Sequence, residues 1–479
     1  METNNKKTIN NVVMVMSSNV IKLLAGVLIG FVIPQIMGQL NYGYYKTYTL
    51  YIGYAGILHF GFIDGIYLLY AGKNYEELEK KQFRCYTKFI TAIELAIGFI
   101  VCCSSFFIKD GSYRYIVFLT GITFFTSNIT SYYQFISQIT GRFKELSVRN
   151  IITTMLQIFS VAIIIILLQT KLLTSLNFKL YILLLVLIYV AVTLWYIYTY
   201  RDITFGESSS FKMERNNIKL FFSVGFPLLV ANLTLNLIMI IDRQYVNILA
   251  NKKIIGMADY GVYAFAYSML SLITTVIDAI SVVLYPTIKS YSQEKLTSDY
   301  NKLIGIIAVV TGFCMVSYYP LLFIVEHWLK GYCDSLPVFR VILPGVILSS
   351  CVTMVMFNYY KAERQHVKFF KISLIVLILS IIADILAYSI TRELVWVSAG
   401  SVFVMGLWYL FAERHIVNTR EINTAKNKLY IAIIIIGYYL ITAFIINILA
   451  GLIIYFLFYA TITYAFYGSS VTSILKPQQ

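Results

Sequence analysis

The stretch "GQLNYGYY" at residues 38–45 has a near copy, "GMADYGVY", at residues 256–263. Glycine and tyrosine recur at four matching places, and the separation between the copies is 218 residues throughout. One short echo can arise by chance in an apolar chain. Its meaning therefore depends on whether further matches follow in the same order.

Two further matches do follow. "FIDGI" at 62–66 pairs with "VIDAI" at 276–280, and "YTKFITAIELAIGF" at 86–99 pairs with "YNKLIGIIAVVTGF" from residue 300. Both pairs are 214 residues apart, four fewer than the first pair. Four residues are about one helical turn, so the same helix face stays aligned. The three ordered matches indicate an internal duplication.

The composition identifies an integral membrane protein. Of the 479 residues, 59% are hydrophobic and only 13% are charged, whereas a soluble protein has about 25% charged residues. The net charge of +15 comes from basic residues scattered between apolar stretches, which argues against a nucleic-acid-binding patch. The six cysteines show no metal-ligand spacing, so neither a disulfide framework nor a zinc site is expected.

A membrane-spanning helix needs about 20 mostly apolar residues. That length predicts about fourteen spans, at residues 12–36, 42–70, 83–107, 113–138, 147–168, 179–200, 217–248, 257–287, 301–325, 336–360, 367–389, 394–413, 428–447 and 449–468. With the N-terminus inside, 25 Lys and Arg residues fall on the cytoplasmic side and nine on the other. This bias predicts that both termini are cytoplasmic.

The duplication relates the second span to the eighth and the third to the ninth. Six spans separate the members of each pair, so both copies have the same orientation, as in parallel-repeat transporters with a binding site between the repeats. We therefore predict an all-α membrane protein with two six-helix lobes related by a pseudo-two-fold axis. The lobes cover residues 1–205 and 206–427, and residues 428–479 form an additional two-helix hairpin with a short cytoplasmic tail.

Polar residues inside spans are candidates for the central cavity, because ionisable groups in lipid are costly and usually face a bundle interior. Pro227 opens a span that it can weaken or bend. The predicted substrate-binding residues are Lys22, Lys46, Asn232, Asn236, Arg243, Tyr267 and Ser271. For Lys22 the alternative is snorkelling to the membrane interface. Lys46 and Asp64 are eighteen residues apart, five full turns, and are expected to share a helix face.

Five carboxylates in or near the spans could couple transport to an ion or could simply be paired with cations. They are Asp64, Glu94, Asp242, Asp278 and Asp384. For Asp64 and Asp278 the alternative is pairing with loop lysines at the membrane surface, and for Asp242 it is an internal ion pair with Arg243.

No catalytic, metal-binding or cofactor-binding motif is found. The sequence lacks a Walker A motif, G-x-S-x-G and H-E-x-x-H, and its four histidines are isolated in sequence. We therefore expect a transporter rather than an enzyme, with no cofactor. Uphill transport would depend on an ion gradient or the membrane potential, and downhill exchange is the alternative.

Several segments resemble the Wzx-type polysaccharide-biosynthesis flippases of the multidrug/oligosaccharidyl-lipid/polysaccharide exporter superfamily. They are the opening "GQLNYGYY" phrase, "FGFIDGIYLLYAGK" at 60–73, and "IDRQYV" at 241–246 before "GVYAFAY". The resemblance implies alternating-access transport of an undecaprenyl-diphosphate-linked oligosaccharide across the bacterial cytoplasmic membrane. The product would feed synthesis of O-antigen, capsule or exopolysaccharide, with a polymerase and chain-length machinery as partners. Cavity cations such as Lys22, Lys46 or Arg243 would attract the diphosphate.

Three other functions stay open from the sequence. A drug/cation antiporter of the same superfamily would use buried carboxylates such as Glu94 and Asp384. A lipid II flippase would be expected to have a more cationic lumen. A membrane glycosyltransferase or polymerase usually has a long outer loop, whereas the loops here are short.

Overall fold

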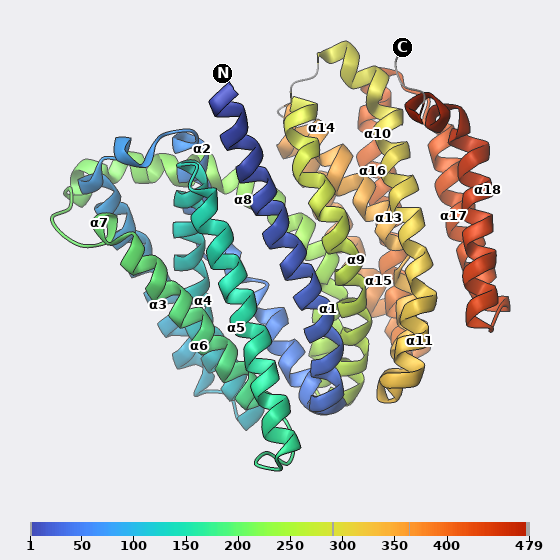
Figure 1. Cartoon of the computed structure of the whole chain (residues 1–479), viewed down its shortest axis with the longest axis horizontal. Coiled ribbons are helices and arrows are strands. Elements are labelled where there is room, and N and C mark those ends of the chain that lie inside the picture. The colour runs from blue at the N-terminus through green and yellow to red at the C-terminus, as the bar shows by residue number, and fades with distance from the viewer. Residues whose placement is uncertain (1, 290–291, 364, 476–479) are drawn as a thin grey trace. The chain divides into compact units, whose positions relative to one another are not determined.

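The computed structural model describes residues 2–289, 292–363 and 365–475. Every regular element among them is a helix, as predicted (Figure 1). By contacts the chain divides into two compact units. Unit 1 comprises Met1–Leu233 and Ala250–Gly261, and unit 2 comprises Thr234–Leu249 and Val262–Gln479. The boundaries predicted from the repeat, near residues 205 and 427, stay a prediction.

Unit 1 contains seven complete α-helices within its described residues, together with two short 3-10 turns. The elements are α1 Glu2–Ile52, η1 Ala55–Ile57, α2 Phe62–Tyr70, η2 Tyr75–Glu77, α3 Lys80–Ser105, α4 Gly111–Ile139, α5 Phe143–Gln169, α6 Phe178–Thr199 and α7 Arg201–Thr204. Two long helices, α8 Phe211–Asn251 and α9 Met257–Lys289, contribute to both units.

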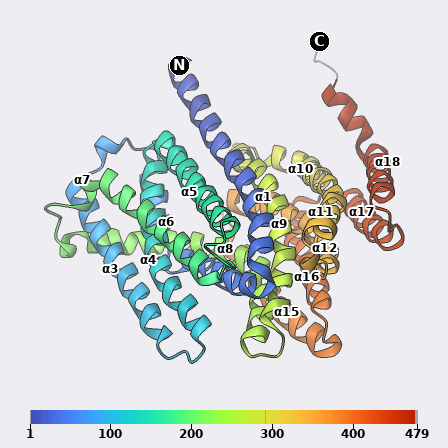
Figure 2. The ribbon, with the colours of Figure 1, turned by 60° about the horizontal axis from the view of Figure 1, so that its bottom comes forward.

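Unit 2 is built from the helices that follow. They are α10 Gln293–Cys314, η3 Met315–Ser317, α11 Tyr318–Trp328, η4 Lys330–Tyr332, α12 Ser335–Ile342, α13 Gly345–Ser350, the π-helix η5 Cys351–Met356, α14 Phe357–Ala362, α15 His366–Thr391, α16 Leu394–Arg420, α17 Ala425–Phe444 and α18 Ile448–Leu475. Helices α17 and α18 lie side by side in both ribbon views (Figure 2) and pack on α10 and α11.

The described part of the chain has nine helices that are long and apolar enough to cross a membrane, or eleven if each of two bent pairs is counted as one span. The bent pairs lie in α8 and in Ser335–Ala362. Helix α4 is not among them, because it carries the polar stretch "NITSYYQFISQ". It packs against α1, α3, α5 and α6, so its polar side chains can face other helices. The protein is a multi-pass membrane protein, and the total of fourteen spans stays a prediction.

The predicted span 42–70 is not one helix, which corrects the sequence analysis. Helix α1 continues through a kink at Gly38 to Ile52, and the chain then leaves the α-helical path before α2 begins at Phe62. Phe60 and Gly61 both have left-handed backbones, with φ of 49° and 83°. Lys46 and Asp64 therefore do not share a helix face, and that prediction was wrong.

Close packing explains why a glycine stands at this break. A Cβ atom on Gly61 would lie 2.5 Å from the backbone nitrogen of Phe226 in α8 and only 2.6 Å from the carbonyl carbon of Gly225. The left-handed conformation disfavours a side chain, and the close backbone contact excludes one. The break is thus built into the packing of α2 on the first half of α8.

Aromatic side chains fill the core of unit 1. The buried cluster draws Phe62 from α2, Tyr86 from α3, Tyr132 from α4 and Tyr196 from α6, and it includes Phe221 of α8. Most of these tyrosine hydroxyls have polar partners, which lets such rings sit in an apolar interior. The first half of α8 therefore belongs structurally to unit 1.

Candidate functional site

A buried polar cluster surrounds Asp242 in unit 2. Asp242 lies in α8 and is 2% exposed. Its Oδ2 accepts hydrogen bonds from the hydroxyls of Tyr267 and Tyr263 in α9 and from Ser401 in α16, at 3.3 Å for Tyr263 and 3.2 Å for Ser401. Its Oδ1 accepts the backbone N–H of Arg243 at 2.6 Å. Two helices, α9 and α16, thus deliver three hydroxyl groups to one carboxylate of α8.

A second carboxylate, Asp384 in α15, lies beside this cluster. It is fully buried, and neither of its oxygens has a hydrogen-bond partner among the described residues. Its electrostatic neighbour is Asp242, so two acidic groups repel each other inside the bundle. An unpaired buried carboxylate is costly unless it binds a proton or a cation. The Asp242–Asp384 pair is therefore the strongest candidate ion site in unit 2.

Arg243 is the cation next to this pair. Its guanidinium lies 5.0 Å from the centre of the Tyr267 ring, and its Nη2 donates to the Met239 carbonyl at 2.8 Å. Its Nε is buried and has no hydrogen-bond partner among the described residues. The structure thus brings Arg243, Tyr267 and Asp242 together, three of the residues predicted from the sequence.

The other predicted substrate-binding residues are more dispersed. Lys22 in α1 is exposed. Lys46, also in α1, is half-buried, with its Nζ 5.1 Å and 5.4 Å from the ring centres of Tyr42 and Tyr45. Asn236 in α8 and Ser271 in α9 are exposed. The side chains of Asn232 and Asp278 lie outside the described residues.

The two predicted carboxylates of unit 1 are both buried. Glu94 in α3 is 0% exposed and accepts a hydrogen bond from Asn128 in α4 at 2.8 Å. Asp64 lies in the first turn of α2, with Oδ2 3.7 Å from Nδ1 of His59. One oxygen of each carboxylate has no hydrogen-bond partner among the described residues.

Sequence analysis missed His59 and Arg149. His59 is buried in the helix break. The sequence could have indicated this break, because Gly53, Gly56 and Gly61 fall within one predicted span and clustered glycines mark chain breaks. Arg149 is 4% exposed in α5, stacked 4.3 Å from the Tyr196 ring centre. Nothing in its sequence neighbourhood distinguishes it from the other arginines beside the predicted spans.

An ionic cluster outside the spans ties the loops of unit 1 together. Asp202 in α7 accepts a hydrogen bond from Tyr75 at 2.6 Å and pairs with Lys80 at 3.1 Å. Partial burial raises the pKa of Asp202, but these two contacts outweigh it and hold the pKa below the usual value. The cluster therefore depends on an ionised Asp202.

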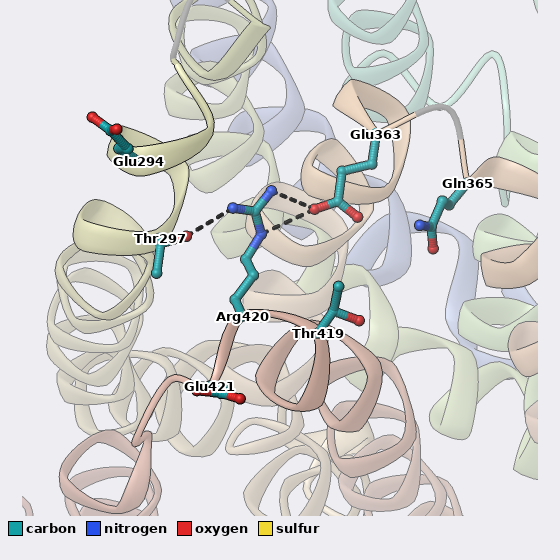
Figure 3. A pocket seen from close by; sticks show the side chains of 7 residues that line it. All are labelled: Glu294, Thr297, Glu363, Gln365, Thr419, Arg420 and Glu421. Carbon is teal, nitrogen blue, oxygen red and sulfur yellow. Dashed lines mark hydrogen bonds and ion pairs between the residues drawn. The ribbon is translucent and has the colours of Figure 1, made fainter.

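Unit 2 also contains an open pocket of about 630 Å³, away from the predicted site residues (Figure 3). Its lining residues are Glu294, Thr297, Glu363, Gln365, Thr419, Arg420 and Glu421. Arg420 donates to Glu363 at 3.0 Å and to Thr297 at 2.8 Å, and the figure shows this contact bridging separate helices. The pocket has three carboxylates, and its one guanidinium is already hydrogen-bonded to Glu363 and Thr297. This excess of negative charge does not suit binding of a diphosphate.

Comparisons with known proteins agree with this architecture. Residues 8–292 match the family described as polysaccharide biosynthesis protein. The lipid II flippase MurJ, in an inward closed conformation, is similar with a TM-score of 0.71 and 14% identity, over 97% of this chain and 100% of that one. An inward-facing multidrug resistance MATE transporter has a TM-score of 0.61 and 15% identity, over 86% of this chain and 99% of that one.

No curated protein sequence matches the chain significantly. The identities to the solved structures are low, so the likeness to MurJ and MATE shows a shared fold. These neighbours are a flippase and a transporter rather than enzymes. The family match covers more than half of the residues. The chain therefore belongs to the polysaccharide biosynthesis protein family, within the fold shared by MurJ and the MATE transporters.

Proposed function

We propose that this protein is an ion-coupled flippase that moves undecaprenyl-diphosphate-linked oligosaccharide repeat units from the inner to the outer leaflet by alternating access. The family supports a role in polysaccharide synthesis, and the fold supports transport. The observation that carries the proposal is the buried Asp242 cluster. Uphill transport without an ATPase motif depends on an ion gradient or the membrane potential, and this cluster supports a coupling-ion site inside the bundle.

The coupling ion would bind at Asp242 and Asp384. Two carboxylates close together bind a proton or a monovalent cation favourably, because either relieves their mutual repulsion. The hydroxyls of Tyr263, Tyr267 and Ser401 already converge on the same Asp242 oxygen and could turn toward a bound cation. Ion binding would thereby change how α8, α9, α15 and α16 are held together.

The substrate would be recognised next to this site. Arg243 is half-buried and stacked on Tyr267, and a guanidinium can hold phosphate oxygens through two parallel N–H bonds. We assign Lys22, Lys46, Asn232, Asn236 and Ser271 to the remainder of the substrate path. Asp278 keeps both roles proposed for it from the sequence, ion coupling or pairing with loop lysines at the membrane surface.

The cellular setting follows from the same proposal. We place the protein in the bacterial cytoplasmic membrane with both termini in the cytoplasm, where the excess of Lys and Arg in the loops favours that side. The translocated units would pass to a polymerase and chain-length machinery for O-antigen, capsule or exopolysaccharide.

The experiment that tests this function is mass spectrometry of lipid extracts from a deletion strain. Accumulation of an undecaprenyl-diphosphate oligosaccharide, together with loss of the surface glycan, is the expected result. Re-expression of the wild-type chain should reverse both changes, whereas an Asp384→Asn variant of equal abundance should not.

Two other results would replace the proposal. Accumulation of lipid II with intact surface glycan would identify a peptidoglycan-precursor flippase. Unchanged glycan lipids together with altered drug tolerance would identify a drug/cation antiporter.

A further inference from the structure

The break between α1 and α2 holds a group of buried polar residues that the Asp242 cluster does not involve. Non-helical backbone at membrane depth is tolerated only where it is buried in protein or lines an aqueous path, and it often marks an ion site. Here Gly53, Gly56 and Phe60 are exposed on one side of the break, and Ala55 and His59 are buried on the other. The segment thus connects the surface of unit 1 to its interior.

His59 holds the turn in place. Its Nδ1 accepts the backbone N–H of Gly61 at 3.2 Å, so Nδ1 carries no proton and the neutral ring is protonated at Nε2. The same Nδ1 lies 3.7 Å from Oδ2 of Asp64, too far for a hydrogen bond. Asp64 Oδ2 is buried and has no hydrogen-bond partner among the described residues.

Glu94 approaches the same break from α3. The amide of Asn128 donates both to Oε2 of Glu94, at 2.8 Å, and to the carbonyl of Ala55 in η1, at 2.9 Å. The same carbonyl also accepts the backbone N–H of Leu58 at 3.0 Å. Glu94 Oε1 is buried without a hydrogen-bond partner among the described residues. The break is therefore next to Asp64 and is linked to Glu94 through Asn128. Each of these carboxylates has one buried oxygen without a hydrogen-bond partner among the described residues.

The elements packed around the break supply little compensating charge. Helix α3 contributes Glu94 and α4 contributes the neutral Asn128. Helix α8 meets the break at Gly225 and Phe226, and its acidic residue Glu214 lies elsewhere, where it accepts hydrogen bonds from Tyr86 at 2.6 Å and from Asn217 at 2.9 Å. No Lys or Arg ion pair to Asp64 or Glu94 is found among the described residues. The described chain also holds no group of three acidic, His or Cys side chains able to bind a metal ion.

We propose that this break is a second ion site, specific for protons, formed by His59, Asp64 and Glu94 and separate from the Asp242 cluster. A proton needs no cavity, and it satisfies a buried carboxylate oxygen directly. One proton from water binds Glu94 at Oε1. Another binds Asp64 at Oδ2, and the resulting O–H is donated to His59 Nδ1.

Proton binding at Asp64 and His59 changes the turn itself. Once Nδ1 shares a proton with Asp64, it can no longer accept the Gly61 N–H, so the left-handed turn loses its side-chain hydrogen bond. The break is then held by Phe62 N–H to His59 O, at 2.9 Å, and by Gly65 N–H to Gly61 O, at 2.8 Å. Protonation thus loosens residues 59–61 while α2 keeps its first turn. A role for this loosening in transport rests on the proposed function. Proton binding at the break does not rest on it.

The test uses the purified full-length protein in lipid nanodiscs without substrate. Infrared difference spectra recorded on acidification detect the C=O band of protonated carboxylic acids. We expect Asp64→Asn and Glu94→Gln each to remove part of that band, and Glu207→Gln, on an exposed loop residue, to leave it unchanged. His59→Gln should shift only the Asp64 component to a different pH, because glutamine accepts the Gly61 N–H but does not titrate.

Hydrogen exchange gives an independent readout. After correction for the intrinsic pH dependence of exchange, peptides covering residues 53–65 should exchange faster on acidification in the wild type but not in Asp64→Asn. A band of undiminished intensity in both carboxylate variants would overturn the proton site. Loss to sodium, at constant pH, of the component that these variants remove would also overturn it. Neither readout requires transport, so failure of the flippase assignment in the deletion strain would be recognised separately.

Discussion

Gly43 and Gly261, which occupy the same place in the two copies of the repeated phrase, pack directly against each other. A Cβ on Gly43 would lie 2.2 Å from the carbonyl oxygen of Met257, four residues before Gly261. A Cβ on Gly261 would lie 2.3 Å from the carbonyl oxygen of Gln39, four residues before Gly43. The contact is reciprocal, as expected if the two helix segments are related by a local two-fold axis. The repeated phrase is therefore a helix-crossing motif that meets its own copy.

Gly43→Ala and Gly261→Ala should each destabilise the protein. Real Cβ atoms do not approach backbone oxygens this closely, so the two helices must separate, and such overpacking costs about 1–3 kcal/mol. The measurement is thermal unfolding of the detergent-solubilised protein by fluorescence-detected size exclusion. Gly30→Ala is the matched control, because no atom lies within 4 Å of its added Cβ. Equal melting temperatures for all three variants would show that the crossing tolerates side chains.

The sequence indicated the duplication but did not predict this crossing. Composition and span length were sufficient for an all-helical membrane protein, because both depend on the bilayer rather than on tertiary contacts. The prediction that Lys46 and Asp64 share a helix face was wrong, because it assumed an unbroken helix. The break between them arises from packing of Gly61 on α8, which the spacing does not report. The Asp242–Ser401 contact joins residues 159 apart in sequence, and no periodicity reports such a pairing.

Asp384→Asn should abolish ion-coupled export while leaving the protein folded. Asparagine keeps the shape of the side chain and removes the repulsion with Asp242, so the helices lose their response to the ion. The measurement is surface glycan in the complemented deletion strain, normalised to membrane abundance of the variant.

Ser401→Ala should have a smaller effect on export than Asp384→Asn. It removes one of several hydrogen bonds to Asp242 and should reduce export several-fold rather than abolish it. Full export by Asp384→Asn at normal abundance would exclude the carboxylate pair from coupling.

Stability of unit 1 should fall in acid through Asp202. The folded-state pKa of this carboxylate is depressed, so its contribution is present above the unfolded-state pKa of about 3.9 and is lost as the pH falls through the lower folded value. Asp202→Asn should therefore lower the melting temperature at neutral pH, and the difference from wild type should shrink toward pH 3. Tyr75→Phe removes one of the two partners and should show a smaller version of the same profile. A pH-independent difference would mean that packing rather than charge is responsible.

Lys428 and Glu413 allow a double-mutant test of how α17 is attached to unit 2. Glu413 in α16 is 0% exposed, and its Oε2 lies 2.7 Å from Lys428 Nζ at the start of α17, while Tyr409 donates to Oε1 at 3.0 Å. Lys428→Met leaves a buried carboxylate without its cation and should cost up to about 3 kcal/mol, since removing one partner of a buried pair is more harmful than removing both.

The double variant Lys428→Met with Glu413→Gln should recover much of that loss, because the glutamine can still accept the Tyr409 hydroxyl and carries no charge. Thermal unfolding of the two single variants and the double variant gives the coupling between the residues. Strictly additive losses would show that the ion pair does not attach the hairpin. Recovery in the double variant would show that the cost of the single variant is the unpaired charge on Glu413 rather than lost contact with the lysine stem.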